Sequence, residues 1–327
     1  MKAVLCKAWG PPESLVVEDV PSPKAGKGQV VVAVRAAGVN FPDVLIVQGK
    51  YQVKPDLPFS PGAEISGTVK EVGEGVTHVK PGDAVVAFPG VGGFAEEVAV
   101  DAARVSPVPK ALDPKVGAAV TLTYGTSYHA LKDCAQLKSG ETLLVLGAAG
   151  GVGLAAVELG KLMGARVIAA ASSPLKLDTA KRAGADEAID YEQEDLREAV
   201  KRLTDGKGVD VVYDPVGDRF AEPALRSLAW HGRYLVIGFA AGAIPKIPLN
   251  LALLMERSIV GVFWGEFTRR NPKANAANMR EVMQWILEGK LKPLVSAAYP
   301  LERATEALVA MMNRQVLGKV VLVTGAG

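Results

Sequence analysis

The 327-residue chain has few of the residues that build disulfide and metal sites, with two cysteines and three histidines. Cys6 and Cys134 are too few for a disulfide framework or a four-cysteine zinc lobe. His78, His129 and His231 are scattered and lack the spacing of metal ligands. We therefore expect no bound metal. With no evident histidine partner, Cys134 is not expected to act as a nucleophile.

Long apolar runs and an excess of charge of one sign are also lacking. No stretch reaches the ~18 apolar residues of a membrane span, and the opening residues 1–7 are too short and too charged for a signal peptide. The net charge of +2, without a run of Lys or Arg, gives no electrostatic basis for nucleic-acid binding. We expect a cytoplasmic globular protein that acts on a small molecule.

The chain changes pattern near residue 120. Before this point, short β-type runs at 29–35, 64–72, 84–87 and 93–100 are separated by Pro/Gly turns, which predicts an antiparallel or barrel-like β domain. From residue 123 onward, strand and helix patterns alternate, which predicts a parallel sheet.

The expected parallel strands can be placed by their buried, β-branched composition. They cover residues 143–146, 167–170, 188–190, 209–213, 234–237 and 258–263. An amphipathic helix at 274–287 and a last strand at 319–323 follow. We therefore predict a β domain at residues 1–122 and a parallel-sheet domain at 123–260. Residues 261–327 form a return segment that completes the first domain.

A run of glycines directly after a buried strand is the most informative motif. Residues 143–153 read LLVLGAAGGVG, and a helical stretch starts at once. Glycines let the backbone approach a pyrophosphate, and the helix N-terminus supplies free N–H groups. The predicted dinucleotide contacts are Gly147, Ala149, Gly150, Gly151, Val152 and Gly153.

The end of the next strand predicts which dinucleotide binds. NAD-binding proteins usually have an Asp or Glu ~20 residues past the glycines, to bind the ribose 2′-hydroxyl. This chain has Ser172, Ser173 and Lys176 there and no carboxylate. Hydroxyl donors and a cation suit a 2′-phosphate, which favours NADPH. The same residues are also typical of an ordinary helix N-cap followed by a solvated lysine.

Seven motifs, taken in order, resemble one known family. They occupy residues 37–43 (AGVNFPD), 48–51 (QGKY), 61–67 (PGAEISG), 79–83 (VKPGD), 147–153, 232–238 (GRYLVIG) and 318–322 (GKVVL). Together they resemble the zinc-free quinone oxidoreductase branch of the medium-chain dehydrogenase/reductase superfamily, over essentially the whole chain. The resemblance implies an α/β protein with a GroES-like β-barrel-type catalytic domain and a Rossmann doubly wound parallel-sheet domain that binds NADPH.

The departures from the zinc alcohol dehydrogenases of that superfamily are informative. This chain has Asn40 and Ala63 where those enzymes have zinc ligands, and the third ligand, expected around Leu122, is missing. Catalytic zinc needs three protein ligands. Without a Lewis acid, the chemistry expected is hydride transfer to quinones or activated alkenes, in which delocalisation stabilises the negative charge.

The resemblance also implies roles for residues of the first domain. It places Asn40 beside the nicotinamide, as a cofactor contact and candidate hydrogen-bond donor, and hydride transfer in a cleft between the two domains. A tyrosine at the place of Tyr51 serves related enoyl-thioester reductases as proton donor or enolate stabiliser. Both residues could instead be ordinary turn or loop residues. Asp43 is the third candidate catalytic residue. An aspartate at such a position is more typical of a side chain that fixes the loop by accepting backbone N–H groups.

Three further cofactor contacts follow from the resemblance. Tyr191 is expected near the adenosine, Phe239 near the nicotinamide ribose and Lys319 near NADPH. The alternatives are a strand-edge tyrosine and, for Lys319 as for Arg314, a surface position.

The leading function is an NADPH-dependent quinone oxidoreductase. The alternatives left open are an NADPH-dependent reductase of acryloyl- or crotonyl-CoA-type thioesters and an NADPH-binding protein without significant turnover. The apolar run at 259–264 could be an exposed strand edge that pairs with its copy, so we expect a homodimer like those of the family.

Overall fold

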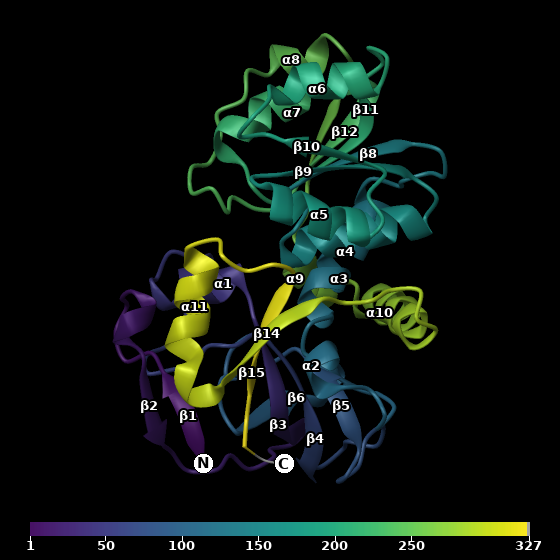
Figure 1. Ribbon diagram of the computed structural model, residues 1–327. Helices are drawn as coiled ribbons and strands as arrows, with labels where there is room; N and C mark the ends of the chain where they lie inside the picture. Colours follow the sequence, from purple (N-terminus) through teal and green to yellow (C-terminus); the bar gives the residue numbers. More distant parts are fainter. Residues whose placement is uncertain (326–327) are drawn as a thin grey trace. The chain divides into compact units, whose positions relative to one another are not determined.

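The computed structural model describes residues 1–325 of the chain, which divides into two compact units. The first unit contains residues 1–122 and the segment from Pro293 onward, and the second contains residues 123–292. Figure 1 shows both units. Each unit has its own sheet and its own hydrophobic core, so each can be understood from its own residues.

The first unit is built on a largely antiparallel sheet in the order β14-β15-β3-β4-β5-β7, and β6 pairs with β3 beside it. The long strand β3 is mostly buried and pairs with three partners. The last strand of the chain, β15, lies antiparallel to it, with Val320 opposite Val39. This register brings Lys319 to the end of β3, where the helix α1 begins.

The strands and helices of this unit lie at both ends of the chain. The strands are β1 (Lys2–Leu5), β2 (Val16–Asp19), β3 (Gln29–Val39), β4 (Glu64–Val72), β5 (Ala84–Ala87), β6 (Glu97–Asp101), β7 (Val105–Pro107), β14 (Val295–Pro300) and β15 (Lys319–Val323). The helices are α1 (Phe41–Val47), α2 (Pro114–Gly117) and α11 (Ala304–Met312), with 3-10 turns η1 (Pro12–Ser14), η2 (Ala102–Arg104) and η5 (Leu301–Arg303).

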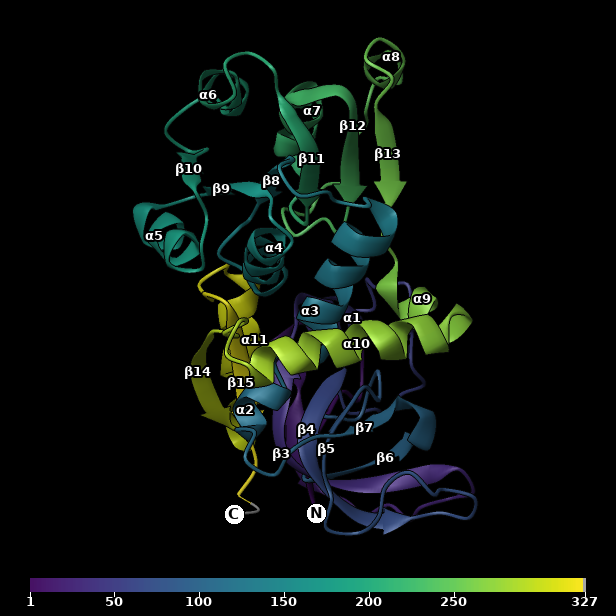
Figure 2. The same cartoon turned by 90° about the vertical axis from the view of Figure 1, so that its right-hand side faces the viewer.

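The second unit is a parallel sheet in the order β10-β9-β8-β11-β12-β13. The order is that of a doubly wound Rossmann fold, so the predicted fold class is confirmed. Leu143, Leu144, Val145 and Leu146 are all 0% exposed, as expected of a strand covered on both faces. Helices α4 and α5 cover one face of the sheet, and α6 and α7 the other (Figures 1 and 2).

The elements of the second unit alternate as the sequence predicts. The strands are β8 (Thr142–Leu146), β9 (Arg166–Ala171), β10 (Glu187–Asp190), β11 (Val209–Asp214), β12 (Leu228–Val236) and β13 (Ser258–Gly261). The helices are α3 (Thr121–Tyr128), the π-helix η3 (His129–Cys134), α4 (Gly151–Leu162), α5 (Pro174–Arg182), α6 (Leu196–Leu203), η4 (Asp218–Phe220), α7 (Ala221–Arg226), α8 (Asn250–Leu253), α9 (Trp264–Arg270) and α10 (Pro272–Leu287).

The return to the first unit comes at Pro293, not at residue 261 as predicted. Helix α10 stays with the second unit because its side chains bond to α3 and η3. The Tyr128 hydroxyl donates to Glu281, and the Tyr128 and Trp285 rings pack edge to face at 5.3 Å. The sixth strand is also shorter than predicted. It ends at Gly261, and Trp264 is buried at the start of α9, where its indole N–H donates to Asn275.

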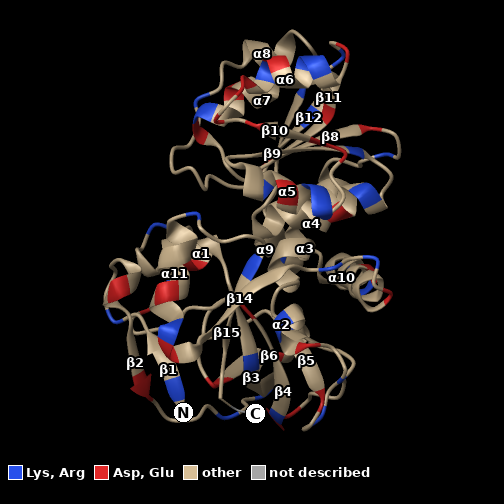
Figure 3. Cartoon of the chain, viewed as in Figure 1, with Lys and Arg blue, Asp and Glu red and all other residues tan. Residues whose placement is uncertain are grey.

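Charge is spread evenly over both units. Figure 3 shows Lys and Arg interspersed with Asp and Glu on most elements. Among the described residues, no helix is both long enough and apolar enough to cross a membrane.

Candidate active site

The glycine turn after β8 has the geometry of a nucleotide-binding turn. Gly147 has φ +56°, a conformation that favours glycine, and a Cβ there would lie 2.9 Å from Val216. A Cβ at Gly153 would lie 2.3 Å from the Gly147 carbonyl oxygen, so only glycine lets the helix pack this close to the turn. Gly150 is the N-cap of α4. The sequence forms this tight turn because its two crowded positions carry no side chain.

Helix α4 begins directly at this turn and runs for 12 residues. The N–H groups of its first turn have no acceptor within the helix, and the helix dipole favours an anion at this end. The predicted contacts Ala149, Gly151 and Val152 therefore lie where a pyrophosphate can accept hydrogen bonds from the backbone.

The end of β9 carries the two predicted 2′-phosphate contacts side by side. Lys176 Nζ donates to Ser172 Oγ at 3.0 Å, which joins the loop to the first turn of α5. Ser173 is the N-cap of α5 by position, but its side chain makes no capping hydrogen bond. A hydroxyl and an ammonium held together form a site with the donors and charge that a phosphate needs.

Tyr191 lies beside this pair. Its backbone N–H donates to the Ala171 carbonyl at 3.2 Å, one residue before Ser172. The half-buried ring packs against Phe220 with centroids 4.3 Å apart. An aromatic ring next to the 2′-phosphate position is where an adenosine contact is expected.

The ends of β11 and β12 form the other half of this edge. Buried Asp214 accepts the N–H groups of Val216 at 2.7 Å and Gly217 at 2.8 Å, and the Tyr234 hydroxyl donates to its second oxygen. Burial raises the pKa of Asp214. A Cβ at Gly217 would lie 2.9 Å from the Phe239 ring, so the predicted contact Phe239 packs directly on this loop.

These residues share one edge of the sheet because the strands are parallel. The chain winds outward from β8 in both directions, to β9 and β10 on one side and to β11, β12 and β13 on the other. Open α/β sheets bind ligands at the carboxyl ends of the strands, where the order switches. The glycine turn, Ser172, Lys176, Tyr191 and Phe239 all follow carboxyl ends. These residues fit NADPH.

The polar centre of the first unit is a buried ion pair. Lys319 Nζ lies 2.6 Å from Glu64 Oε1, with the two side chains 4% and 0% exposed. The ammonium also donates to Asn40 Oδ1 at 2.6 Å and to the Val39 carbonyl at 3.0 Å. Glu64 Oε2 accepts the Leu122 N–H at 2.9 Å. Partners on every side compensate the cost of burying two charges.

The same cluster shows which protein groups bind the Asn40 and Lys319 side chains. The Asn40 amide nitrogen donates to Glu64 Oε1 at 2.9 Å and to the Gly38 carbonyl at 3.3 Å, so both of its protons are used inside the protein. The expected place of Asn40 beside the nicotinamide stays a prediction. Lys319 does not lie on the surface, and its three protons have acceptors within the unit.

Asp43 is buried on the adjacent first turn of α1. It accepts the Asn40 N–H at 2.8 Å and the Gly62 N–H at 3.3 Å, which is the loop-fixing geometry that the sequence favoured. Burial raises the pKa of Asp43 to about 7, against the lowering effect of the Asn40 N–H and of Lys319.

Tyr51 is half-buried and packs against the core of the first unit. Burial, with a smaller effect of the Asp43 carboxylate, raises the pKa of its hydroxyl. Within residues 1–325 no protein group bonds to this hydroxyl. Of the predicted catalytic side chains, Tyr51 therefore keeps a proton to donate at neutral pH and has no acceptor for it inside the protein.

The residues at the positions of zinc ligands do not fit a zinc ion. Ala63 and Leu122 carry no donor atom, and the Asn40 amide is bonded within the cluster. A catalytic zinc needs three side chains with thiolate, imidazole or carboxylate donors. The three positions therefore do not form a catalytic zinc site.

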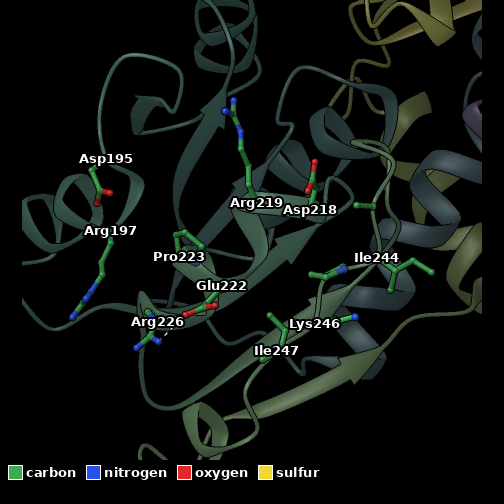
Figure 4. Close-up of a pocket in the computed structure, with 12 residues that line it drawn as sticks. Asp195, Arg197, Asp218, Arg219, Glu222, Pro223, Arg226, Ile244, Lys246 and Ile247 are labelled. Atoms are coloured by element: carbon green, nitrogen blue, oxygen red, sulfur yellow. Dashed lines mark hydrogen bonds and ion pairs between the residues drawn. The ribbon is translucent and has the colours of Figure 1, made fainter.

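A separate pocket of about 520 Å³ lies in the second unit (Figure 4). Its lining mixes acidic and basic side chains from the start of α6, from η4 and α7, and from residues 243–247. Arg219 pairs with Glu192 at 2.7 Å and Arg226 with Glu222 at 2.7 Å, so charges of opposite sign balance along its wall. None of the predicted cofactor contacts lines it.

Two structural features are not evident from the sequence. Glu64 lies within one of the seven motifs, and its role as the carboxylate that holds Lys319 and Asn40 depends on contacts between distant segments. Asp214 and Tyr234, which hold the loop after β11, carry no motif of their own. The only related signal in the sequence is a carboxylate that stands between Ala63 and Ile65 at the start of β4.

The turn, the Ser172–Lys176 pair and the sheet order define a dinucleotide-binding protein, and comparison with known proteins places it among the oxidoreductases. Residues 26–110 match the family model "Alcohol dehydrogenase GroES-like domain", and residues 151–288 match "Zinc-binding dehydrogenase". The chain is 42% identical to quinone oxidoreductase-like protein 2 homolog of Nematostella vectensis, over 99% of this chain and 89% of that protein.

Solved structures agree with the sequence comparison. The Escherichia coli quinone oxidoreductase complexed with NADPH is 29% identical with a TM-score of 0.92, over 99% of this chain and 100% of that one. The CurK enoyl reductase is 26% identical with a TM-score of 0.89, over 99% of each chain. The chain belongs to the quinone oxidoreductase family of the medium-chain dehydrogenase/reductase superfamily. It is an oxidoreductase that uses NADPH.

The raised pKa of Asp43 predicts a pH-dependent stability. Folded Asp43 keeps its proton up to about pH 7, whereas the unfolded side chain loses it near 3.8. Between these values the folded state binds more protons, so this group makes the free energy of unfolding fall as pH rises, by up to about 1.4 kcal/mol per pH unit. Between pH 4.5 and 8, the free energy of unfolding measured with denaturant should fall less in Asp43→Asn than in the wild type.

The matched control is Asp19→Asn, which changes an exposed carboxyl of the same unit and should leave the slope as in the wild type. An Asp43→Asn slope equal to that of the wild type would show that Asp43 ionises normally in the folded protein.

Proposed function

We propose that this protein is a zinc-independent NADPH:quinone oxidoreductase. The observation that carries the proposal is the donor set at residues 40, 63 and 122, which is unsuited to a Lewis acid. An acceptor reduced there has to delocalise negative charge within its own π system, and quinones do so. The quinone oxidoreductase relatives support the same class of acceptor.

NADPH, when bound, supplies the hydride. On the protein side, backbone N–H groups at residues 149–153 bind the pyrophosphate, and Ser172 and Lys176 bind the 2′-phosphate. Tyr191 contacts the adenosine and Phe239 the nicotinamide ribose.

In the first unit, Tyr51 donates a hydrogen bond to the acceptor oxygen on which negative charge develops. Lys319 and Glu64 hold Asn40 in place, while Asp43 fixes the loop. Asn40 and Lys319 thus serve as positioning residues.

An NADPH-dependent enoyl-thioester reductase is the second candidate. It is supported by the likeness to the CurK enoyl reductase and by Tyr51, since a tyrosine hydroxyl can stabilise an enolate as well as a reduced quinone. The two reactions use the same hydride source and the same donor, so the choice between them depends on the acceptor alone.

NADPH oxidation with three acceptors tests the function. We expect fast turnover with 1,4-benzoquinone and 9,10-phenanthrenequinone and slow turnover with crotonyl-CoA. We also expect Tyr51→Phe to lower kcat about 10- to 100-fold, because one hydrogen bond to a charged oxygen is lost. Treatment with EDTA to remove metal should leave the rate of NADPH oxidation unchanged.

Fast crotonyl-CoA turnover without quinone activity would favour the thioester reductase. NADPH binding by fluorescence with no turnover of any acceptor would favour a protein that binds NADPH without catalysis. Tyr51→Phe with full turnover would remove Tyr51 from the mechanism.

The Ser172–Lys176 pair predicts a preference for NADPH. Lys176→Ala should raise KM for NADPH about tenfold or more and leave kinetics with NADH nearly unchanged, because only the 2′-phosphate loses a charge-assisted hydrogen bond. The exposed Lys181→Ala on the same helix is the matched control. Wild-type enzyme with a higher kcat/KM for NADH would contradict this assignment.

We also propose a homodimer formed through the edge strand β13. Among residues 1–325 this strand pairs with β12 alone, and Ile259 on it is 41% exposed. Apolar side chains near it are also exposed, including Leu253 at 77%, Leu254 at 66% and Phe263 at 57%. An unpaired edge with apolar neighbours is suited to pairing with a second copy about a two-fold axis.

Light scattering at micromolar concentration should give twice the mass of the chain. Ile259→Lys should shift the protein to a monomer, since it puts a charge on the pairing edge. A monomer mass for the wild-type protein would exclude this dimer.

A further inference from the structure

A π-helical turn in the second unit brings three reactive side chains together. The segment η3, His129–Cys134, is π-helical, and the Ala135 N–H donates to the Ala130 carbonyl, five residues back, at 2.9 Å. In an α-helix, residues five apart lie about 140° apart around the axis. The wider π turn puts them on one face, and such turns are frequent at functional sites.

Cys134 consequently lies next to His129, a contact that the sequence does not predict. Its Sγ lies 3.5 Å from His129 Nε2, and His129 Nδ1 lies 2.8 Å from Asp133 Oδ2. A carboxylate at Nδ1 holds the proton on that nitrogen, which leaves Nε2 as an acceptor facing the thiol. This corrects the expectation that Cys134 has no histidine partner.

Neighbouring helices hold the arrangement from outside η3. Asn278 of α10 donates its amide to Asp133 Oδ2 at 2.8 Å. Phe267 of α9 stacks on the His129 ring, with centroids 3.8 Å apart and planes 16° apart. The imidazole is therefore fixed both in its plane and in its tautomer, as a general base must be.

We propose that Cys134 is a covalent modification site for soft electrophiles of the α,β-unsaturated carbonyl class, with His129 as the base. In the addition, Sγ forms a bond to the β-carbon while His129 Nε2 takes the thiol proton. The electrons of the C=C bond move onto the carbonyl oxygen as an enolate, and the proton returns from His129 to the α-carbon. The step needs no oxidant or reductant and does not rest on the proposed function.

The second cysteine provides an internal control. Cys6 is 1% exposed, and its thiol donates to the carbonyls of Ala8 at 3.3 Å and Val47 at 3.8 Å. Burial raises the pKa of both thiols, with a further contribution from Asp133 at Cys134. Both rest as neutral thiols, so the half-buried Cys134 differs from Cys6 in having a base and access to a reagent.

The test is intact-protein mass spectrometry of the full chain during reaction with N-ethylmaleimide. We expect one adduct, located on Cys134 by peptide mapping, while Cys6 stays unmodified. Cys134→Ser should form no adduct and keep its NADPH-dependent turnover. His129→Gln should slow the addition at least tenfold, and Asn278→Ala should slow it less, because it loosens the Asp133 carboxylate and leaves the imidazole in place.

Circular dichroism melting shows whether each variant is folded, and modification of Cys6 reports exposure of the core of the first unit. Three results would overturn the proposal. These are no adduct on native protein, faster modification of Cys6 than of Cys134, and an unchanged rate in folded His129→Gln.

Discussion

The polar centre of the first unit depends on the buried ion pair between Lys319 and Glu64. Removing two charges from water costs several kcal/mol each, and the pair persists because carbonyl, amide and N–H groups complete its hydrogen bonds. The two charges come from the starts of β4 and β15, and their partners come from the end of β3, from Asn40 and from Leu122. The ends of the chain therefore fold as one unit around this pair.

The candidate sites of the two units are built from different kinds of groups. In the second unit, the glycine turn and the start of α4 offer backbone groups, and the absence of side chains at Gly147 and Gly153 is what makes the turn possible. In the first unit the candidate site consists of side chains, and hydrogen bonds among these side chains hold them in place.

Local patterns predicted much of this architecture. Buried apolar runs marked the parallel strands, and the short Ser172–Lys176 spacing lets a loop hydroxyl meet a lysine of the first turn of α5. The predicted domain boundary at residue 261 was wrong, because contacts between distant segments decide where the second unit ends. Helix α10 joins the second unit through Tyr128, Glu281 and Trp285, which no reading of residues 274–287 alone could reveal.

By itself, the sequence determined the Rossmann order, the nucleotide turn and the lack of zinc donors, because each depends on residue types a few positions apart. The tertiary structure decided which groups remain free to act. It places Lys319 against the Asn40 amide oxygen, 279 residues away, and Glu64 against the Asn40 amide nitrogen. It also winds η3 as a π-helix, which moves Cys134 next to His129. Both outcomes depend on packing and hydrogen-bond competition, which local residue spacing does not encode.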